Sequence, residues 1–185
     1  MTRSVLLIAL LGACGFDSSS ASDASNDAQP TDAAIDGPPA ALGVLFINEV
    51  MPSNTASCMD IVGEFDDWIE LYNSGATAIA LGGYTITDAP GTPNKVTLDA
   101  SVIVPAHGFR LLWADDQIQG LDHLAFKLAS AADSISLFAP DGTRLDTYAW
   151  TTAAPTDSSY ARVPDGTGAF ITTATPTCGA TNGTP

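Results

Sequence analysis

The sequence predicts an all-β domain that folds as a sandwich or a barrel. From Val44 onward, short runs of strand-forming residues alternate with turn residues, and no long stretch keeps the helical period of about 3.6 residues. Two of the turns, Asp141-Gly142 and Gly82-Gly83, carry residue pairs that favour β-hairpins. Many short strands at this spacing are typical of sandwiches and barrels.

Eleven segments qualify as candidate strands, because each combines β-branched, aromatic or aliphatic residues with flanking turn residues. They are residues 44–51, 67–73, 78–81, 84–87, 95–98, 101–104, 108–114, 123–128, 134–138, 145–149 and 159–163. We do not expect all eleven to form. The chain from Thr172 onward, rich in Thr, Pro, Gly and Ala, predicts a loop that is either pinned to the domain or free.

Residues 66–73 have the densest strand signal and predict a central strand. Large apolar side chains occupy both of its faces, with Trp68 and Tyr72 on one face and Ile69 and Leu71 on the other. Neither face can therefore be fully exposed to water. Glu70 shares a face with the aromatic residues, so we expect it to lie at the rim of the sheet, to pair with a donor such as Arg110, or to bind a cation.

The first 13 residues predict a secretion signal, because one base is followed by an apolar run too short to cross a bilayer as a helix of about 20 residues. The end of this run, Leu11-Gly12-Ala13-Cys14, resembles a bacterial lipobox. The resemblance implies that Cys14 is lipidated and becomes the new N-terminus. The alternative is an ordinary signal peptide cut near Ala13, with Cys14 as a spare thiol. Gly15 follows the cysteine, and the resemblance to sorting signals then favours the outer membrane of the cell envelope.

Residues 14–43 are expected to form a tether between the lipidated cysteine and a single domain at 44–185. The segment after Cys14 is rich in Asp, Ser, Ala and Pro, contains no base and has no periodicity. A chain of this composition has too few bulky apolar side chains to collapse, so it is predicted to be disordered.

The charge balance excludes nucleic acid as a default partner. Twenty-one acids against six bases give a net charge of -15, and the bases are scattered singly along the chain. Such a surface repels phosphate backbones and anionic lipid headgroups.

Four acids, Asp60, Glu64, Asp66 and Asp67, crowd into the segment before the central strand, together with Gly63. Carboxylates are the hard oxygen ligands that calcium prefers, so the segment is a candidate calcium site, although its spacing is not that of an EF-hand. The alternative is a solvated acidic loop. A second and weaker acidic cluster consists of Asp115, Asp116 and Asp122.

No catalytic residue is predicted. The sequence has only two histidines, His107 and His123, and lacks a Gly-x-Ser-x-Gly elbow, a His-x-x-x-His pair and a Cys-x-x-Cys motif. We interpret both histidines as ordinary surface or turn residues and expect a protein that is not an enzyme.

The cysteine count predicts one disulfide. Export leads to an oxidising compartment, and lipidation consumes Cys14, which leaves Cys58 and Cys178 to pair. The alternatives are two buried free thiols or an intermolecular bridge.

A series of short motifs narrows the fold further. They are residues 47–54, 67–73, 81–88, 105–115, 123–128, 140–143, 160–166 and 176–182. In this order they resemble a bacterial lamin tail domain. The resemblance implies an immunoglobulin-like β-sandwich without a known catalytic centre, here without the coiled-coil rod of nuclear lamins.

The sequence therefore predicts a lipid-anchored, non-catalytic binding module of the cell envelope, facing the cell surface or the periplasm. Its expected contacts are the membrane, through the lipid, and an unidentified protein or glycan. The alternatives are a structural spacer or assembly component of the envelope and a cryptic hydrolase. No cofactor is expected apart from the candidate calcium ion.

Overall fold

The computed structural model describes residues 43–183, and all eleven strands found there belong to antiparallel sheets. The strands are β1 (Leu45–Met51), β2 (Trp68–Asn73), β3 (Ile79–Ala80), β4 (Thr85–Thr87), β5 (Val96–Thr97), β6 (Ile103–Val104), β7 (Gly108–Trp113), β8 (Asp133–Phe138), β9 (Arg144–Trp150), β10 (Ser159–Val163) and β11 (Ala169–Thr173). The expected signal peptide, Cys14 and nearly all of the tether lie outside the described residues. Within this range no helix is long and apolar enough to cross a membrane.

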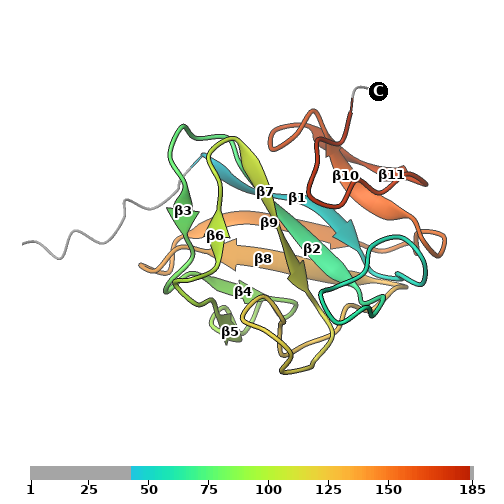
Figure 1. Cartoon of the computed structure of the whole chain (residues 1–185), viewed down its shortest axis with the longest axis horizontal. Helices are drawn as coiled ribbons and strands as arrows, with labels where there is room; N and C mark the ends of the chain where they lie inside the picture. Colours follow the sequence, from blue (N-terminus) through green and yellow to red (C-terminus); the bar gives the residue numbers. More distant parts are fainter. Residues whose placement is uncertain (1–42, 184–185) are drawn as a thin grey trace, which may run out of the picture. The chain divides into compact units, whose positions relative to one another are not determined.

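Two sheets form the main layers of the domain. One has the strand order β11-β10-β1-β2-β7, and the other has the order β5-β4-β8-β9 (Figure 1). A short pair, β3 with β6, forms a third sheet. The all-β fold is confirmed and is consistent with an immunoglobulin-like sandwich.

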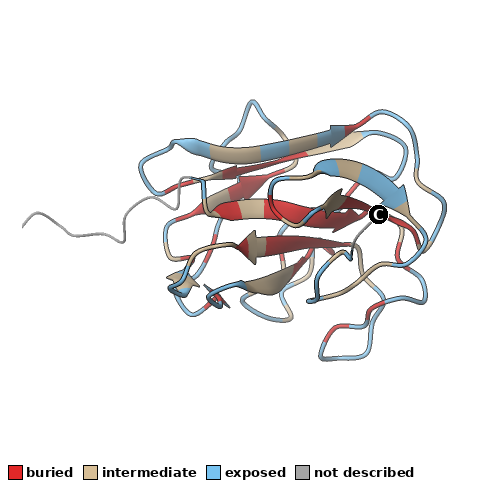
Figure 2. Ribbon diagram, turned by 90° about the horizontal axis from the view of Figure 1, so that it is seen from above, coloured by how far each residue is buried: buried red, intermediate tan, exposed pale blue. Residues whose placement is uncertain are grey.

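The core lies between the two main sheets. β1 and β2 contribute Ile47, Ile69 and Leu71, and β8 contributes Ile135 and Leu137, all fully buried. Buried residues follow the central strands, and exposed residues gather on the loops and outer strands (Figure 2). The alternation expected for β2 is therefore correct, since Ile69 and Leu71 belong to this core while Trp68 belongs to a separate cluster.

A partly buried ion pair joins the two layers at β9 and β10. Arg162 Nη2 donates to both oxygens of Asp146, at 2.8 and 2.9 Å. The same two side chains also bond the backbone of β1, because Arg162 Nε donates to the carbonyl of Ile47 and Asp146 Oδ2 accepts from its amide. Strands of both sheets are thus held by one charge-assisted network.

Ten of the eleven expected strands form, and the exception is residues 123–128. This segment makes only isolated bridges, Trp113 with His123 and Asp115 with Lys127. β11 was missed, because residues 169–173 are followed directly by the loop-like tail.

Of the two predicted hairpins, the one at Gly82-Gly83 is wrong. The turn is present, with Tyr84 N bonded to Leu81 O, but it leads from β3 in one sheet to β4 in another. The Asp141-Gly142 hairpin between β8 and β9 is confirmed.

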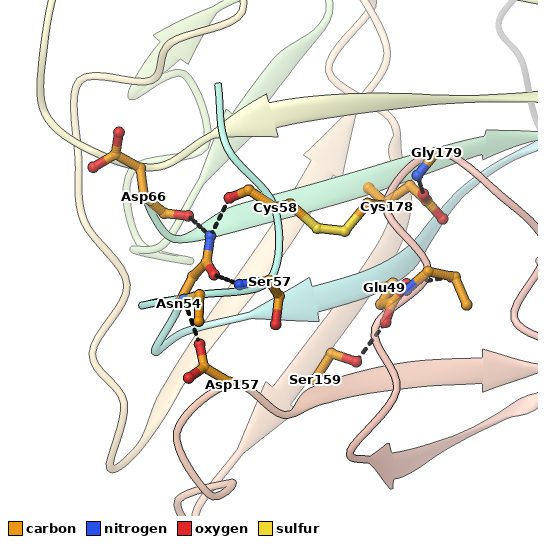
Figure 3. Close-up of a disulfide and its surroundings, with 12 residues drawn as sticks. Glu49, Asn54, Ser57, Cys58, Asp66, Asp157, Ser159, Cys178 and Gly179 are labelled. Carbon is orange, nitrogen blue, oxygen red and sulfur yellow. Dashed lines mark hydrogen bonds between the residues drawn. A yellow bond between two sulfur atoms is a disulfide. The ribbon is translucent and has the colours of Figure 1, made fainter. Parts of the chain in front are cut away.

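The expected disulfide joins Cys58 and Cys178, whose Cα atoms lie 6.3 Å apart. Figure 3 shows this disulfide and its surroundings. It packs with Trp68 and Trp113 on the face of the five-stranded sheet opposite the core. Met51 and Leu111 complete this second apolar cluster. The bridge therefore fixes the C-terminal tail over a face that would otherwise expose two tryptophans.

Reduction of this disulfide is expected to destabilise the domain strongly. The two cysteines are 120 residues apart, and closing a loop of about 100 residues contributes about 4.7 kcal/mol in the chain-entropy picture. Urea unfolding with and without reductant would measure the loss. The double variant Cys58→Ala/Cys178→Ala is the control, because its unfolding should not respond to reductant. An unchanged midpoint for the fully reduced wild type would contradict the prediction.

Candidate functional site

Two loops emerge from the same end of the five-stranded sheet. Residues 52–67 precede β2 and residues 114–132 follow β7, and the register pairs Trp68 directly with Trp113 (Figure 1). Antiparallel pairing therefore places the loops side by side. Ala114 N donates to Asp67 O at 2.7 Å, and Gln119 Nε2 donates to Glu64 Oε2 at 2.8 Å.

Asn54 closes the base of the first loop. Its buried side-chain amide donates to the carbonyls of Cys58 and Asp66, at 2.7 and 2.9 Å, and its side-chain oxygen accepts from Ser57 N (Figure 3). Asp157, from the segment before β10, holds the adjacent turn by accepting from the backbone amide and hydroxyl of Thr55. The two ends of residues 59–65 are thus fixed close together.

Three of the four predicted metal-binding acids come together in this loop. Carboxylate oxygens of Asp60, Glu64 and Asp66 all lie within 4.8 Å of one another. Asp60 Oδ1 accepts from the amides of Val62 and Glu64, so the loop is folded around the Asp60 side chain. Burial, and then the charges of Asp115, Glu64 and Asp60, raise the pKa of Asp66.

The structure places the fourth acid elsewhere. Asp67 Oδ1 accepts from Asn54 N at 3.2 Å, which directs its carboxylate toward the base of the loop. Burial raises the pKa of Asp67 to about 6. The cluster therefore consists of Asp60, Glu64 and Asp66.

His123 is not the surface residue that we expected. Its side chain is buried, with Nδ1 in a short hydrogen bond to Asp115 Oδ2 and Nε2 at 3.9 Å from Asp60 Oδ2. Among the described residues no hydroxyl or thiol is hydrogen-bonded to this ring. His107 does lie in an exposed turn, at φ 49°, immediately before β7.

The second acidic cluster does not form, because its three members make separate contacts. Asp115 bonds His123, Asp122 pairs with Arg110 at 2.7 Å, and Asp116 is exposed with φ 59°. A shallow cavity beside Arg110 and Asp122 is lined also by Phe109, Leu111, Trp113 and Gly179. Neither His123 nor the cluster of Asp60, Glu64 and Asp66 lines it.

Exposed apolar side chains concentrate on the same two loops. Of the eight large hydrophobic residues that are exposed within 43–183, six lie here. They are Met59, Ile61, Val62 and Phe65 on the first loop and Ile118 and Leu121 on the second. We call these six residues the loop patch. Ile61 is 93% exposed and Ile118 is fully exposed, so neither contributes to the core.

A pair of buried glutamates lies beneath the C-terminal tail. Glu49 on β1 stands directly opposite Glu70 on β2, and both residues are fully buried. Burial raises the pKa of Glu70 to about 8, with smaller contributions from Glu49 and Asp165, and burial also raises the pKa of Glu49. Glu70 is therefore mainly protonated at neutral pH.

The bulge and the tail supply the partners of these acids. Asn48 is the extra residue of a β-bulge in β1, and its side-chain amide donates to Glu70 Oε1 and to Asp165 Oδ1, both at 3.0 Å. Gly179 N donates to Glu70 Oε2, and Thr177 donates its amide and hydroxyl to Glu49 Oε2. Of the partners expected for Glu70, Arg110 is wrong, since it pairs with Asp122.

Comparison with known proteins identifies the family. Residues 38–152, more than half of the chain, match the family described as Lamin Tail Domain. The chain belongs to the lamin tail domain family. No curated protein and no solved structure shows a significant match.

The lamin tail domain match indicates a non-catalytic, immunoglobulin-like module. The matched range includes Cys58, the acidic cluster and both loops of the loop patch. It ends before β10, so Cys178 and the tail that covers Glu70 lie beyond the part matched to lamin tail domains.

The buried glutamates predict that the free energy of unfolding falls as pH rises from about 5 to about 8. Glu70 keeps its proton in the folded state up to about pH 8, whereas the unfolded chain releases it near the ordinary value of 4.5. The folded state thus binds more protons in this window, and a rise in pH favours unfolding. Urea unfolding at a series of pH values would measure the slope.

Two variants test the assignment of this pH dependence. Glu70→Gln removes the titrating proton and should flatten the slope. Asp141→Asn removes an exposed carboxylate whose pKa is lowered by hydrogen bonds from Thr143, so it should keep the wild-type slope in this window. Equal slopes for Glu70→Gln and wild type would show that Glu70 is not responsible.

Proposed function

We propose that this lamin tail domain protein is a lipid-anchored, non-catalytic binding module of the cell envelope, and that it binds its partner through the loop patch. The observation that carries the proposal is the concentration of exposed apolar side chains on two neighbouring loops. Clustered exposed apolar groups mark interaction sites, because their burial against a partner releases them from water.

The chemistry of the loop patch favours a protein partner over a glycan. Five of its six side chains are aliphatic or thioether groups, and Phe65 is the only aromatic one. Such groups bury well against the apolar centre of a protein interface. The net charge of -15 further disfavours nucleic acid and anionic lipid headgroups as the surface that the patch contacts.

The proposed anchor is the lipid on Cys14. It rests on the apolar run that ends in Leu11-Gly12-Ala13-Cys14, and the Gly15 that follows favours the outer membrane. Stable membrane attachment needs more than one acyl chain, since each buried methylene contributes about 0.8 kcal/mol.

Replacement of the lipidation site is expected to release the protein from the membrane. Cys14→Ser removes the thiol that would carry the acyl chains, while it leaves the apolar signal unchanged. Detergent partitioning and membrane fractionation of cells that produce wild type or variant would report the location. Equal membrane retention of the two proteins would contradict lipidation at Cys14.

Polar substitutions in the loop patch are expected to weaken partner capture. The double variant Ile61→Ser/Ile118→Ser removes the two most exposed apolar side chains and should reduce capture from solubilised envelope by about tenfold or more, as expected for residues central to an interface. The full-length lipidated protein would serve as bait, with quantitative mass spectrometry of the captured proteins as the readout.

The matched control is Ile103→Ser/Ile171→Ser. These isoleucines are 46% and 44% exposed and lie on β6 and β11, away from the loop patch. Exposed substitutions of this kind change stability little, so both double variants should fold. If the control loses the partner to the same extent, or if the loop-patch variant keeps it, the proposed binding surface is wrong.

A further inference from the structure

The acidic cluster combines the buried Asp60, the partly buried Asp66 and the exposed Glu64, and none of the three pairs with a Lys or Arg residue. Among residues 43–183, the ion pairs of Lys and Arg all involve other acids, namely Asp88, Asp122 and Asp146. Elsewhere in the domain, the buried Glu70 is satisfied by amide donors. Two buried oxygens of the cluster, Asp60 Oδ2 and Asp66 Oδ2, have no such donors.

The unpaired atoms make this observation specific. The side chain of Asp60 is completely buried, and its Oδ2 has no hydrogen-bond partner. Asp66 Oδ2 and Gln119 Oε1 are also buried without a partner. His123 Nε2 lies 3.9 Å from Asp60 Oδ2, which is beyond hydrogen-bond distance. Two of these unpaired oxygens belong to the cluster, and the third belongs to Gln119, whose Nε2 donates to Glu64 Oε2 across the two loops.

We propose that Asp60, Glu64 and Asp66 form a binding site for one calcium ion. The positive charge of the ion would satisfy the unpaired oxygens of Asp60 and Asp66 and offset the repulsion among the three acids. The inference goes beyond the proposed function and does not depend on it, because it rests only on the geometry of these side chains.

The dimensions of the cluster suit calcium. Calcium binds oxygens at about 2.3 to 2.6 Å, so two ligands of one ion lie at most about 5 Å apart. The three carboxylates meet this limit, since their ligand atoms lie within 4.8 Å of one another. Calcium accepts an irregular set of six to eight oxygens, including water, whereas magnesium requires a near-ideal octahedron of shorter bonds. Glu64 is exposed and Asp66 is partly exposed, which leaves room for water ligands.

The local backbone is already arranged for such an ion. Asp60 Oδ1 is held by the amides of Val62 and Glu64, and Gly63 takes a positive φ of 90° that brings Glu64 back toward Asp60. Glycine adopts this conformation without strain. Little reorganisation is therefore needed to bind, and the ion would stabilise the loop that carries four residues of the loop patch.

Isothermal titration of the chelator-treated full-length protein with calcium chloride tests the proposal directly. We expect one site per chain, with a dissociation constant on the order of 0.1 to 1 mM, as in extracellular calcium modules, and binding of magnesium that is about tenfold weaker or more. The melting temperature should rise with calcium concentration, because the ion binds the folded state.

Variants distinguish a site from diffuse attraction. Asp66→Asn removes one charge without breaking a side-chain hydrogen bond of the described structure, and Glu64→Gln keeps an oxygen and the exposed position; each should weaken calcium binding by about tenfold or more. The matched control, Asp116→Asn, removes one charge from a neighbouring exposed position outside the cluster and should change affinity by less than about twofold.

Three results would overturn the proposal. They are the absence of calcium binding to the folded wild type, unchanged affinity in both cluster variants, and an equal loss of affinity in Asp116→Asn. The first result would mean that the acidic cluster is only part of a solvated loop. The titration measures the ion itself, so its outcome is independent of whether the loop patch captures a protein.

Discussion

The two central strands of this domain, β1 and β2, carry buried side chains on both faces, so each face must be covered by another part of the chain. The second sheet packs on one face of β1 and β2 and encloses the main core. The other face is covered by the chain after β10, which reaches back with Gly166 against Phe46 and Tyr72 and with Cys178 against Trp68. Gly166 has no room for a larger side chain, since an added Cβ would lie 2.9 Å from the Phe46 ring. The family match, residues 38–152, ends before this second cover.

The shortage of bases decides how the buried acids are stabilised. Three of the six Lys and Arg residues pair with Asp88, Asp122 and Asp146. The remaining acids depend on other means. Glu70 keeps its proton and accepts from amides. Asp157 and Asp141 remain at the surface, where backbone donors lower the pKa of each carboxyl group, and the Ser101 hydroxyl lowers the pKa of the exposed Asp99. In the cluster around Asp60, by contrast, Asp60 Oδ2 and Asp66 Oδ2 are buried without a hydrogen-bond partner.

Local sequence patterns predicted the strands well, because the alternation in β2 and the turn residues between strands are short-range signals. The disulfide was also predictable from the cysteine count and the expected compartment. Contacts that depend on long-range geometry could not be predicted in this way. The partner of Glu70 depends on a one-residue bulge at Asn48, and nothing local to Glu70 indicates that bulge. His123 was misjudged because its burial depends on the first loop folding against the second. Residues 123–128 have strand composition, yet the loop geometry allows only isolated bridges there.

The first loop is closed by contacts at its two ends, so the stability of the fold depends little on the exposed side chains between them. Asn54 bonds the carbonyls on both sides of residues 59–65, and Cys58 is tied covalently to Cys178. A closed surface loop tolerates substitutions and insertions, since lengthening it adds little entropy cost. The exposed positions between Cys58 and Asp66 can therefore change while the sandwich is kept, much as antibody loops vary on a constant framework. Under the proposed function, a change of partner would therefore arise through these exposed positions.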